Sequence, residues 1–334
     1  MAPMFSVLVP VYNAGEYLED CVRSLQEQSC QDFEVVLVDD GSTDGSGQVC
    51  DRLAAEDPRI RAYHKENGGQ LHTRLAAMEQ ANGEYFVFLD SDDTLVPHAL
   101  ETIREAFCRT GSDCILYEIQ RVWQGKIIDS VPEKPEETIT EKRELYRRCF
   151  TTNGYNSMCC KAVRAEVCTR RDYTGYYHLR HAEDLLQSID ILKNCRSVTF
   201  LHRALYNYTN NPNSVTQKRS ADTYRVDFTV RQAVLDFLQQ EGVFTEADYR
   251  MYRTVCIRTL LREAKTIGRL KTGTAQKKAL LCQVRDHAYY RDFLMAGDYD
   301  KKRLGKDAML LSMLKKKQDG LLLAVLKLSA MLRG

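Results

Sequence analysis

The stretch YFVFLDSDD, Tyr85–Asp93, decides the fold. Its first five residues are apolar and mostly aromatic or β-branched, which is typical of a central strand covered on both faces. Three carboxylates follow, at Asp90, Asp92 and Asp93. In an open α/β sheet, this end of a strand opens onto the ligand crevice. Because neighbouring carboxylates repel each other, a hard divalent cation is their natural partner. The stretch therefore predicts metal-assisted binding of an anionic substrate.

Strand-like and helix-like segments alternate around this stretch, from residue 5 to about residue 120. Buried-type runs predict strands over 5–9, 34–38, 60–63, 85–89 and 114–119. Apolar spacing predicts helices over 16–28 with Asn13 as its cap, around Val49 and Leu53, over 70–80, and from Pro97 to about Arg109. Repeated βα units imply right-handed crossovers and an open, mainly parallel sheet flanked by helices, a Rossmann-like α/β fold.

The alternation ends after residue 120. We expect a hairpin over 121–131 that turns at Gly125–Lys126, a charged loop over 132–140, short helices over 141–149 and 182–193, and late strands over 198–201 and 204–208. From about Ala221 the apolar spacing is helical to the end. A domain boundary near residue 216 is therefore predicted, between an α/β domain (1–216) and a helical C-terminal region (217–334).

Composition narrows the class of protein. The 334 residues are 44% hydrophobic and 28% charged, as in a soluble globular protein. Because 47 basic residues balance 46 acidic ones, nucleic acid is not an expected partner. Residues 1–13 lack the charged start of a signal peptide, and no apolar run is long enough to span a membrane. Twelve cysteines without a CxxC pair then indicate reduced, mostly buried thiols and a cytoplasmic location.

Polar turns follow the first two predicted strands. Pro10 fixes the backbone after the first strand, and Tyr12 offers a flat face on which a base can stack. An ordinary turn with a surface tyrosine is the alternative. Asp39 and Asp40 follow the second strand, where a carboxylate can accept the imide N–H of uracil. Capping of the next helix is the alternative for this pair.

Two later segments complete the set of candidates. Asn67 and Arg74 precede the aspartate cluster, and Arg74 would add a fixed cation beside it. Glu183 and Asp184 begin a predicted helix, where a carboxylate can remove a proton from an attacking hydroxyl, although helix capping explains them as well. Further metal-ligand candidates, with polar helix entry as the alternative, are His178, His181 and His202.

Together these segments resemble a family 2 glycosyltransferase, an inverting enzyme of the GT-A fold. The resemblance covers about the first 215 residues and rests on short motifs in the family's order and spacing. They are SVLVPVYN (6–13), VDDGSTDGS (38–46), ENGG (66–69) with Arg74, GEYFVFLDSDD (83–93), AED (182–184) and YNYTNNPNSVT (206–216). Leu75 and Ala77 stand where the family commonly has asparagine and glycine, so the motifs do not imply one donor sugar.

The resemblance implies a role for each candidate. Pro10, Tyr12 and Asp40 would contact the nucleoside, which the resemblance implies to be uridine. Asp39 would lie alongside, and Asn67 would belong to the same donor-binding set. Arg74 would lie close to the base or the diphosphate, Asp90 would meet the ribose and metal region, Asp92 would bind the metal, and Asp93 would contact the donor sugar. Asp184 would be the general base, with Glu183 supporting it or contacting the acceptor.

The implied reaction moves a hexose or N-acetylhexosamine from a nucleotide-diphosphate sugar, a UDP-sugar, to a hydroxyl of a glycan or lipid-linked acceptor. The implied cofactor is Mn²⁺ or Mg²⁺, and the implied process is surface polysaccharide synthesis. Two other functions share some of these features: a sugar nucleotidyltransferase and a non-catalytic sugar-nucleotide-binding assembly subunit. A sugar nucleotidyltransferase usually has a basic, glycine-rich loop after its first strand, and this sequence lacks the basic residues there. A non-catalytic subunit would not need a catalytic base such as Asp184.

The C-terminal segment 309–334 combines apolar runs with Lys315–Lys317, Lys327 and Arg333. One interpretation is a helix that lies on the inner face of the membrane and brings the enzyme to lipid-linked acceptors. The other is a helix that packs on the rest of the chain or on a second copy in a homo-oligomer.

Overall fold

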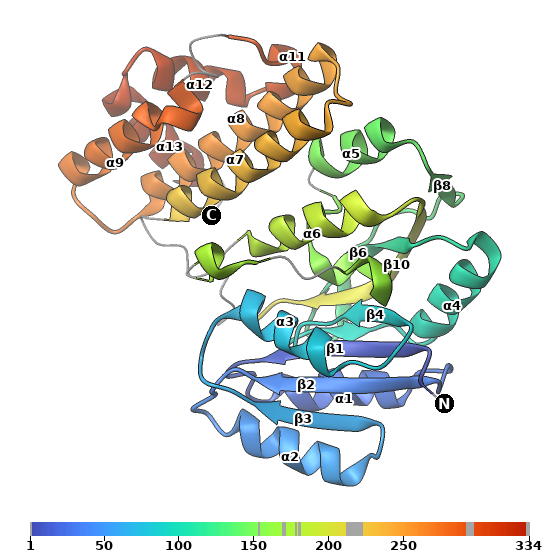
Figure 1. Ribbon diagram of the computed structural model, residues 1–334. Helices are drawn as coiled ribbons and strands as arrows, with labels where there is room; N and C mark the ends of the chain where they lie inside the picture. The colour runs from blue at the N-terminus through green and yellow to red at the C-terminus, as the bar shows by residue number, and fades with distance from the viewer. Residues whose placement is uncertain are drawn as a thin grey trace. The chain divides into compact units, whose positions relative to one another are not determined.

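The computed structural model describes residues 2–152, 154–168, 172–177, 179, 182–211, 223–291 and 297–331. The chain forms two compact units (Figure 1). The first consists of Met1–Leu145 with Gly154–Ser214, and the second of Tyr146–Asn153 with Val215–Gly334. The boundary near residue 216 stays a prediction, because residues 212–222 lie outside the described residues.

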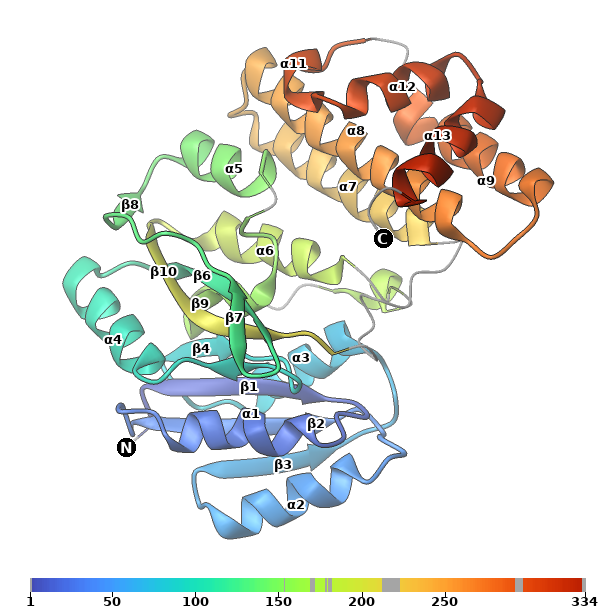
Figure 2. The ribbon, with the colours of Figure 1, turned by 180° about the vertical axis from the view of Figure 1, so that it is seen from behind.

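The first unit begins with alternating strands and helices, as predicted. They are β1 (Phe5–Val11), α1 (Tyr17–Gln26), β2 (Phe33–Asp39), α2 (Ser46–Glu56), β3 (Ile60–His64), α3 (Gln70–Gln80), β4 (Tyr85–Phe88) and α4 (Ala99–Thr110). β1, β2 and β4 are buried along their whole length, because helices cover both faces of the sheet. Figures 1 and 2 show α3 on one face and α1 on the other.

The strands form one sheet, in the order β3-β2-β1-β4-β9-β6-β10-β5, with β7 on β6 and β8 on β10. The remaining strands of the described residues are β5 (Thr94–Leu95), β6 (Cys114–Trp123), β7 (Lys126–Asp129), β8 (Glu137–Ile139), β9 (Lys161–Arg164) and β10 (Val198–Thr209). β1, β2, β3, β4, β6 and β10 run in one direction, and the other four run against them. The predicted open, mainly parallel α/β sheet is therefore confirmed.

Several local predictions are wrong. The predicted loop 132–140 contains β8, which pairs with β10. The two late strands form the single strand β10, whose register with β6 shifts around His202, where φ is 40°. β9 was not expected, because its four residues begin and end with a charge. Asn13 does not cap α1; its side chain accepts the N–H of Thr43 at 2.8 Å and joins the turns after β1 and β2.

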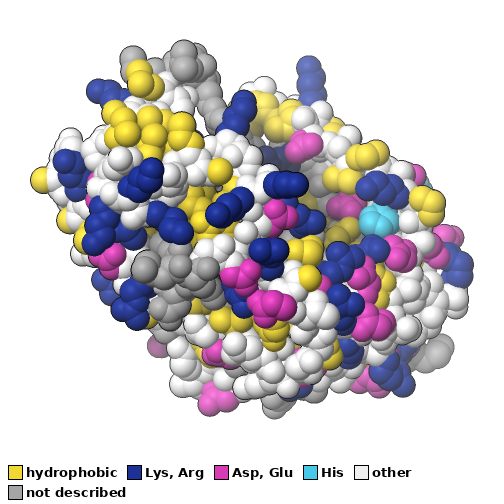
Figure 3. Space-filling view, turned by 90° about the horizontal axis from the view of Figure 1, so that it is seen from above, with side chains coloured by type: hydrophobic (Ala, Val, Ile, Leu, Met, Phe, Trp, Pro, Cys, Tyr) yellow, Lys and Arg dark blue, Asp and Glu magenta, His cyan; other side chains and the backbone are white. Residues whose placement is uncertain are grey.

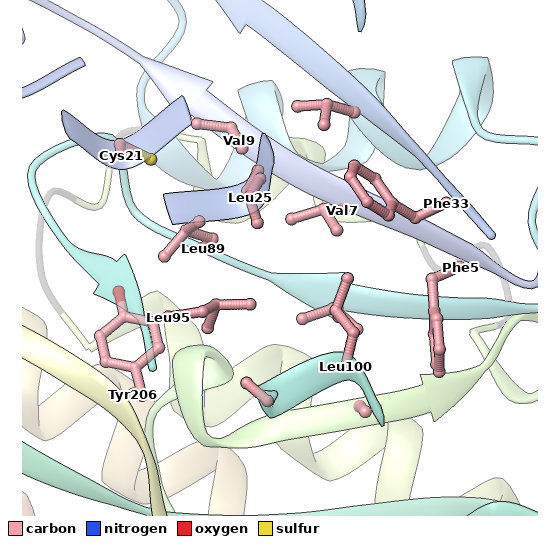
Figure 4. Packing of buried hydrophobic residues seen from close by; sticks show 14 of the residues in the cluster. Phe5, Val7, Val9, Cys21, Leu25, Phe33, Leu89, Leu95, Leu100 and Tyr206 are labelled. Atoms are coloured by element: carbon pink, nitrogen blue, oxygen red, sulfur yellow. The ribbon is translucent and has the colours of Figure 1, made fainter. Parts of the chain in front are cut away.

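A hydrophobic core lies between β1, α1 and α4 (Figure 4). Leu25 of α1 points toward β1, and Leu95 lies beside the ring of Tyr206. Each such fully buried side chain contributes about 1.5–3 kcal/mol of hydrophobic stabilisation. Nine of the twelve cysteines are also buried, as the sequence predicts.

The second unit is helical, as predicted for the C-terminal region. Its helices include the end of α5 (Lys142–Phe150), α7 (Thr223–Glu241), α8 (Glu246–Arg269), α9 (Thr274–Asp286), α11 (Lys301–Leu304), α12 (Asp307–Lys315) and α13 (Asp319–Met331). A capping box starts α8, because the side chains of Thr245 and Asp248 each accept the other's backbone N–H. Within the described residues, no helix combines the length and the apolar character needed to cross a membrane.

Gly83, which precedes β4, lies directly against the backbone of β1. Its N–H donates to Ser6 Oγ at 2.8 Å, and a Cβ added at Gly83 would lie 2.5 Å from the backbone nitrogen of Ser6. Gly83→Ala is therefore expected to destabilise the first unit by about 1–3 kcal/mol, the usual cost of overpacking. Urea unfolding of Gly83→Ala and of the original protein measures the difference.

Gly175→Ala is the matched control, because a Cβ there would meet no atom of the described residues within 4 Å. Equal midpoints for the two alanine variants would contradict the close approach of Gly83 to β1.

Candidate active site

The carboxyl ends of β1, β2, β3 and β4 lie along one edge of the sheet. Val11 pairs with Asp39, and Asp39 with His64, which aligns the ends of the first three strands. The end of β4 joins them, because the N–H of Leu89 donates to the carbonyl oxygen of Leu8 at 3.1 Å. The turns that follow these strands carry Tyr12, Asp40, Lys65 and Asp90.

Asp40 holds the loop between β3 and α3. Its buried carboxylate accepts the N–H groups of Gly68 and Gly69, each at 2.8 Å, and forms an ion pair with Lys65. The side chain of Asn67 donates to the carbonyl oxygen of Asp40 at 3.0 Å. Gly69 has a φ of 86°, which glycine adopts at little cost. Contact of Asp40 with the nucleoside stays a prediction, and these internal partners do not favour it.

Asp39 and Tyr12 differ in what they can reach. Asp39 is buried, and its carboxylate accepts the N–H of Ser42 at 2.9 Å and lies 3.1 Å from His64 Nδ1. Burial opposes ionisation of Asp39, but its hydrogen bonds outweigh burial and lower the pKa. Tyr12 follows the buried Pro10 and is 50% exposed. The ring of Tyr12 is therefore open to a ligand at this edge, whereas Asp39 stabilises a turn.

The aspartates after β4 have different surroundings. Asp93 is 1% exposed, and its oxygens accept the hydroxyl of Tyr206 at 2.6 Å and the N–H of Thr209 at 2.7 Å. Asp92 is partly buried and accepts the side-chain amide of Asn211 at 2.9 Å. Asp93 therefore ties β10 to the turn after β4. Its contact with the donor sugar stays a prediction, and its burial does not favour it.

The cluster is electrostatically suited to a cation. Burial, and then the negative charge of Asp90, raise the pKa of Asp92, and burial with both neighbouring aspartates raises that of Asp93. The described residues contain no ready-made group of three or more His, Cys, Asp or Glu side chains for a metal ion. Asp92 and Asp90 offer the oxygen ligands that Mg²⁺ and Mn²⁺ prefer. These two carboxylates are therefore of the kind that would hold a divalent ion.

Arg74 joins the aspartate cluster to the predicted base. Its guanidinium is 1% exposed; Nη2 donates to Asp90 Oδ1 at 3.1 Å, and Nη1 donates to Asp184 Oδ1. Nη1 also lies 3.7 Å from Glu183 Oε1. Burial opposes the charge of Arg74, but the charges led by those of Asp184 and Asp90 raise its pKa well above the usual value. One buried cation therefore connects two carboxylates that are far apart in the sequence.

Asp184 is held through both oxygens. Oδ1 accepts from Arg74, and Oδ2 accepts Ser157 Oγ at 3.1 Å and the N–H of Met158 at 3.3 Å. Its side chain is 25% exposed at the start of α6 (Glu183–Asn194). Glu183 is buried, and burial followed by the charge of Asp184 raises its pKa to about 7. Asp184 is therefore the more accessible carboxylate of the two.

Two contacts of Asp90 were not expected from the sequence. Gln70 Nε2 donates to Asp90 Oδ1 at 2.9 Å, and the thiol of Cys159 lies 3.1 Å from Oδ2. In the sequence, Gln70 is the first residue of a predicted helix and Cys159 is one of two adjacent cysteines. Neither pattern predicts a contact with Asp90. The ion pair of Lys65 with Asp40 was also not expected. The position of Lys65 directly before the motif ENGG could have indicated it.

The histidine candidates are only partly described. His178 and His181 lie outside the described residues, as does the 212–216 part of the predicted motif 206–216. His202 Nδ1 lies 3.3 Å from Glu118 Oε1 and 3.4 Å from the hydroxyl of Tyr155. These contacts link His202 to Glu118, not to the aspartate cluster.

Comparison with known proteins gives a family for this arrangement. Residues 6–171 match the model of the family described as Glycosyl transferase family 2. The chain is 39% identical over 117 residues to the glycosyltransferase GlyG of Streptococcus pneumoniae serotype 4, which is 35% of this chain and 39% of that protein. It is 29% identical over 229 residues to the uncharacterized glycosyltransferase EpsJ of Bacillus subtilis, 65% of this chain and 64% of that protein. The chain thus matches less than two thirds of the length of these two relatives.

A solved structure of S. aureus TarS residues 1–349, in complex with UDP-GlcNAc, resembles this chain with a TM-score of 0.69 at 23% identity. The likeness covers 99% of this chain and 92% of that chain. It confirms the α/β sheet with flanking helices and the helical C-terminal region. Residues 6–171 therefore match the family 2 glycosyltransferases, and the chain has the fold of the TarS structure, which confirms the resemblance to a GT-A glycosyltransferase.

Proposed function

We propose that the chain is an inverting, metal-dependent glycosyltransferase. It moves a hexose or N-acetylhexosamine from a UDP-sugar to a hydroxyl of a glycan or lipid-linked acceptor, in surface polysaccharide synthesis. One observation carries the proposal: Arg74 contacts both Asp90, on the donor side, and Asp184, the candidate base. Donor-side and acceptor-side groups therefore share one buried ion-pair network.

Asp184 is the proposed general base. It accepts the proton of the acceptor hydroxyl while that oxygen forms a bond to the anomeric carbon of the donor. The bond from this carbon to the diphosphate oxygen breaks, its electron pair leaves with UDP, and the configuration inverts. Arg74 forms an ion pair with Asp184 and donates a hydrogen bond to Oδ1, which leaves the carboxylate held beside the donor side of the site. Glu183, buried behind it, supports the base.

Asp92 and Asp90 are the residues that would hold Mn²⁺ or Mg²⁺. Once bound, the ion supplies positive charge beside the departing diphosphate. The burial and repulsion that raise the pKa of Asp92 are the conditions that a cation relieves. Arg74 already balances part of the charge of Asp90, so Asp92 carries the larger share of the metal site.

The nucleoside end of the donor is assigned to the edge at β1 and β2. Tyr12 supplies an exposed ring for uracil, beside Pro10, Asp39 and Asp40. Asn67 is exposed in the loop that Asp40 holds. The solved TarS structure contains UDP-GlcNAc, which supports a UDP-sugar as the donor here.

The contacts of Asp184 favour a transferase over the two other functions. A non-catalytic binder has no use for a partly exposed carboxylate held by Arg74, Ser157 and Met158. A sugar nucleotidyltransferase needs basic residues after strand one, where Tyr12 and Asn13 stand. On the face shown in Figure 3, basic and acidic side chains are interspersed, which does not favour a nucleic acid partner.

A cytoplasmic enzyme that meets lipid-linked acceptors would also contact the inner face of the membrane. α12 and α13 bury Leu314 and Leu322 within the second unit, so much of the segment packs inside the chain. Apolar and basic side chains remain exposed on these helices and in the turn between them, at Met309, Lys316, Lys317, Leu321, Lys327 and Leu328. This combination suits an anionic lipid surface.

Asp184→Asn should abolish turnover and retain donor binding. General base catalysis contributes about 10²–10⁴ in rate, so release of nucleotide diphosphate should fall by at least about 100-fold. Calorimetry should show UDP affinity within about twofold of the original. A screen of UDP- and GDP-sugars with Mn²⁺ or Mg²⁺, scoring hydrolysis and thermal shift, identifies the donor for the rate assay.

Asp190→Asn makes the same chemical change further along α6, where the carboxylate accepts the hydroxyl of Tyr173. It should leave turnover nearly unchanged. Full activity of Asp184→Asn would remove Asp184 as the base.

Asp92→Asn should remove the metal-dependent part of UDP binding. Loss of a charged ligand should weaken UDP affinity in Mn²⁺ by about tenfold or more, which corresponds to about 1.4 kcal/mol. Affinity in EDTA should not change. Asp20→Asn is the control, because Asp20 is exposed on α1 and pairs with Arg23. UDP affinity that is equal with and without metal in the original protein would contradict the metal site.

Leu321→Ser combined with Leu328→Ser should weaken binding to anionic vesicles. Both side chains are more than half exposed, so the packing of α13 should survive. Co-sedimentation with phosphatidylglycerol vesicles should fall by about half or more. Ile127→Ser with Ile128→Ser is the control, because these β7 side chains are similarly exposed. Equal sedimentation of the two double variants would eliminate the membrane contact through α13.

A further inference from the structure

Lys161, the first residue of β9, is a fully buried lysine, and no described carboxylate lies within ion-pair distance of it. Its ammonium has three donors. They meet the carbonyl oxygen of Tyr155 at 2.7 Å, the carbonyl oxygen of Ser157, and Cys160 Sγ at 3.7 Å. Burying an ammonium is costly unless it is hydrogen-bonded. The ammonium of Lys161 therefore holds the backbone of segment 155–157.

The backbone of Lys161 is itself fixed within the sheet. β9 pairs with β4 on one side, where Val87 lies opposite Ala162. It pairs with β6 on the other side, where Leu116 lies opposite Lys161. β4 is the strand that ends at the aspartate cluster. The ammonium therefore links segment 155–157 to the same strands that position Asp90.

Segment 155–157 in turn reaches Asp184. Ser157 Oγ donates to Asp184 Oδ2 at 3.1 Å and accepts the N–H of Cys159 at 3.2 Å. Ser188 of α6 donates to the carbonyl oxygen of Asn156 at 3.2 Å, which ties the segment to the helix that carries Asp184. Among the described residues of this segment, Ser157 is the one whose side chain donates a hydrogen bond to Asp184 Oδ2.

We propose that Lys161 and Ser157 are positioning residues for the base of the transfer reaction. The inference rests on the proposed function, because it takes Asp184 as that base. Lys161 fixes the carbonyl groups of segment 155–157, Ser157 holds Oδ2, and Arg74 holds Oδ1. With its two oxygens held from separate elements, the carboxylate keeps one orientation toward the acceptor hydroxyl.

The consequence is specific to the chemical step. A misplacement of about 1 Å can cost about 100-fold in rate when reacting groups must be aligned. Within the described residues, no hydrogen bond joins the side chain of Lys161 or Ser157 to Tyr12, Asp92 or another proposed donor-binding residue. Loss of either side chain should therefore lower kcat and leave donor binding intact.

Ser157→Ala is the principal test. For the UDP-sugar that the original protein turns over, kcat of nucleotide release should fall by about tenfold or more. KM for the donor and the calorimetric Kd for UDP should stay within about twofold. Ser157→Thr keeps the hydroxyl and should restore kcat to within about threefold of the original. Unchanged kcat in Ser157→Ala, or a threonine variant as slow as the alanine variant, would overturn the proposal.

Lys161→Met removes all three donors and keeps an unbranched side chain that is one atom shorter. Like Ser157→Ala, it should lower kcat and leave UDP affinity unchanged. An unchanged kcat would show that Lys161 is not a positioning residue. If this variant does not fold, the comparison of Ser157→Ala with Ser157→Thr still tests the proposal. Ser112→Ala is the matched control: Ser112 is a buried serine before β6, hydrogen-bonded to Thr199 at 2.7 Å. It should lower stability without lowering kcat.

The outcome for Asp184→Asn separates this inference from the proposed function. If the Asp184→Asn protein is active, Asp184 is not the base, and the positioning role of Lys161 and Ser157 is refuted as well. An inactive Asp184→Asn protein with a fully active Ser157→Ala protein leaves the base in place and removes only the positioning role.

Discussion

The buried guanidinium of Arg74 is the interaction on which the site depends. Asp90, just after β4, and Asp184, at the start of α6, both pair with this cation, which offsets the charge of two neighbouring carboxylates. Removing one partner of a buried ion pair costs about 3–5 kcal/mol, since the other charge is left without compensation. Arg74 is held in α3, and the entry to α3 is fixed by Asp40 through Gly68 and Gly69. The conformation of one loop therefore determines where the cation lies.

The sheet brings these pieces together by two different connections. The parallel strands β1 to β4 place their turns at one edge, as the alternating pattern of the sequence predicts. β9 then enters antiparallel between β4 and β6, and it brings segment 155–160 to the same edge. The proposed donor-side residues thus come from the regular βα part. The residues that hold Asp184, the proposed base, come mostly from the irregular segment after it.

The sequence predicts the regular part well, because hydrophobic period and strand-end carboxylates are local signals. The strands β1 to β4, the helix α3, and the grouping of Asp90, Arg74 and Asp184 follow from them together with the family resemblance. The partners of a side chain are not local. Asp40 and Asp93 read as ligand-binding carboxylates, yet the structure gives their oxygens to backbone N–H groups, Lys65 and Tyr206. β9 was missed because its pairing partners lie in distant strands.

The two oxygens of Asp184, the proposed base, are held by separate groups. Arg74 is the charge partner of the carboxylate and also donates a hydrogen bond to Oδ1. Ser157 acts on its orientation, because a hydroxyl at 3.1 Å contributes little charge but selects one oxygen. A change at Arg74 must therefore disturb Asp90 and the donor side as well. A change at Ser157 leaves the ion pair between Arg74 and Asp184 in place, so the orientation of the proposed base can be varied while its charge partner is kept.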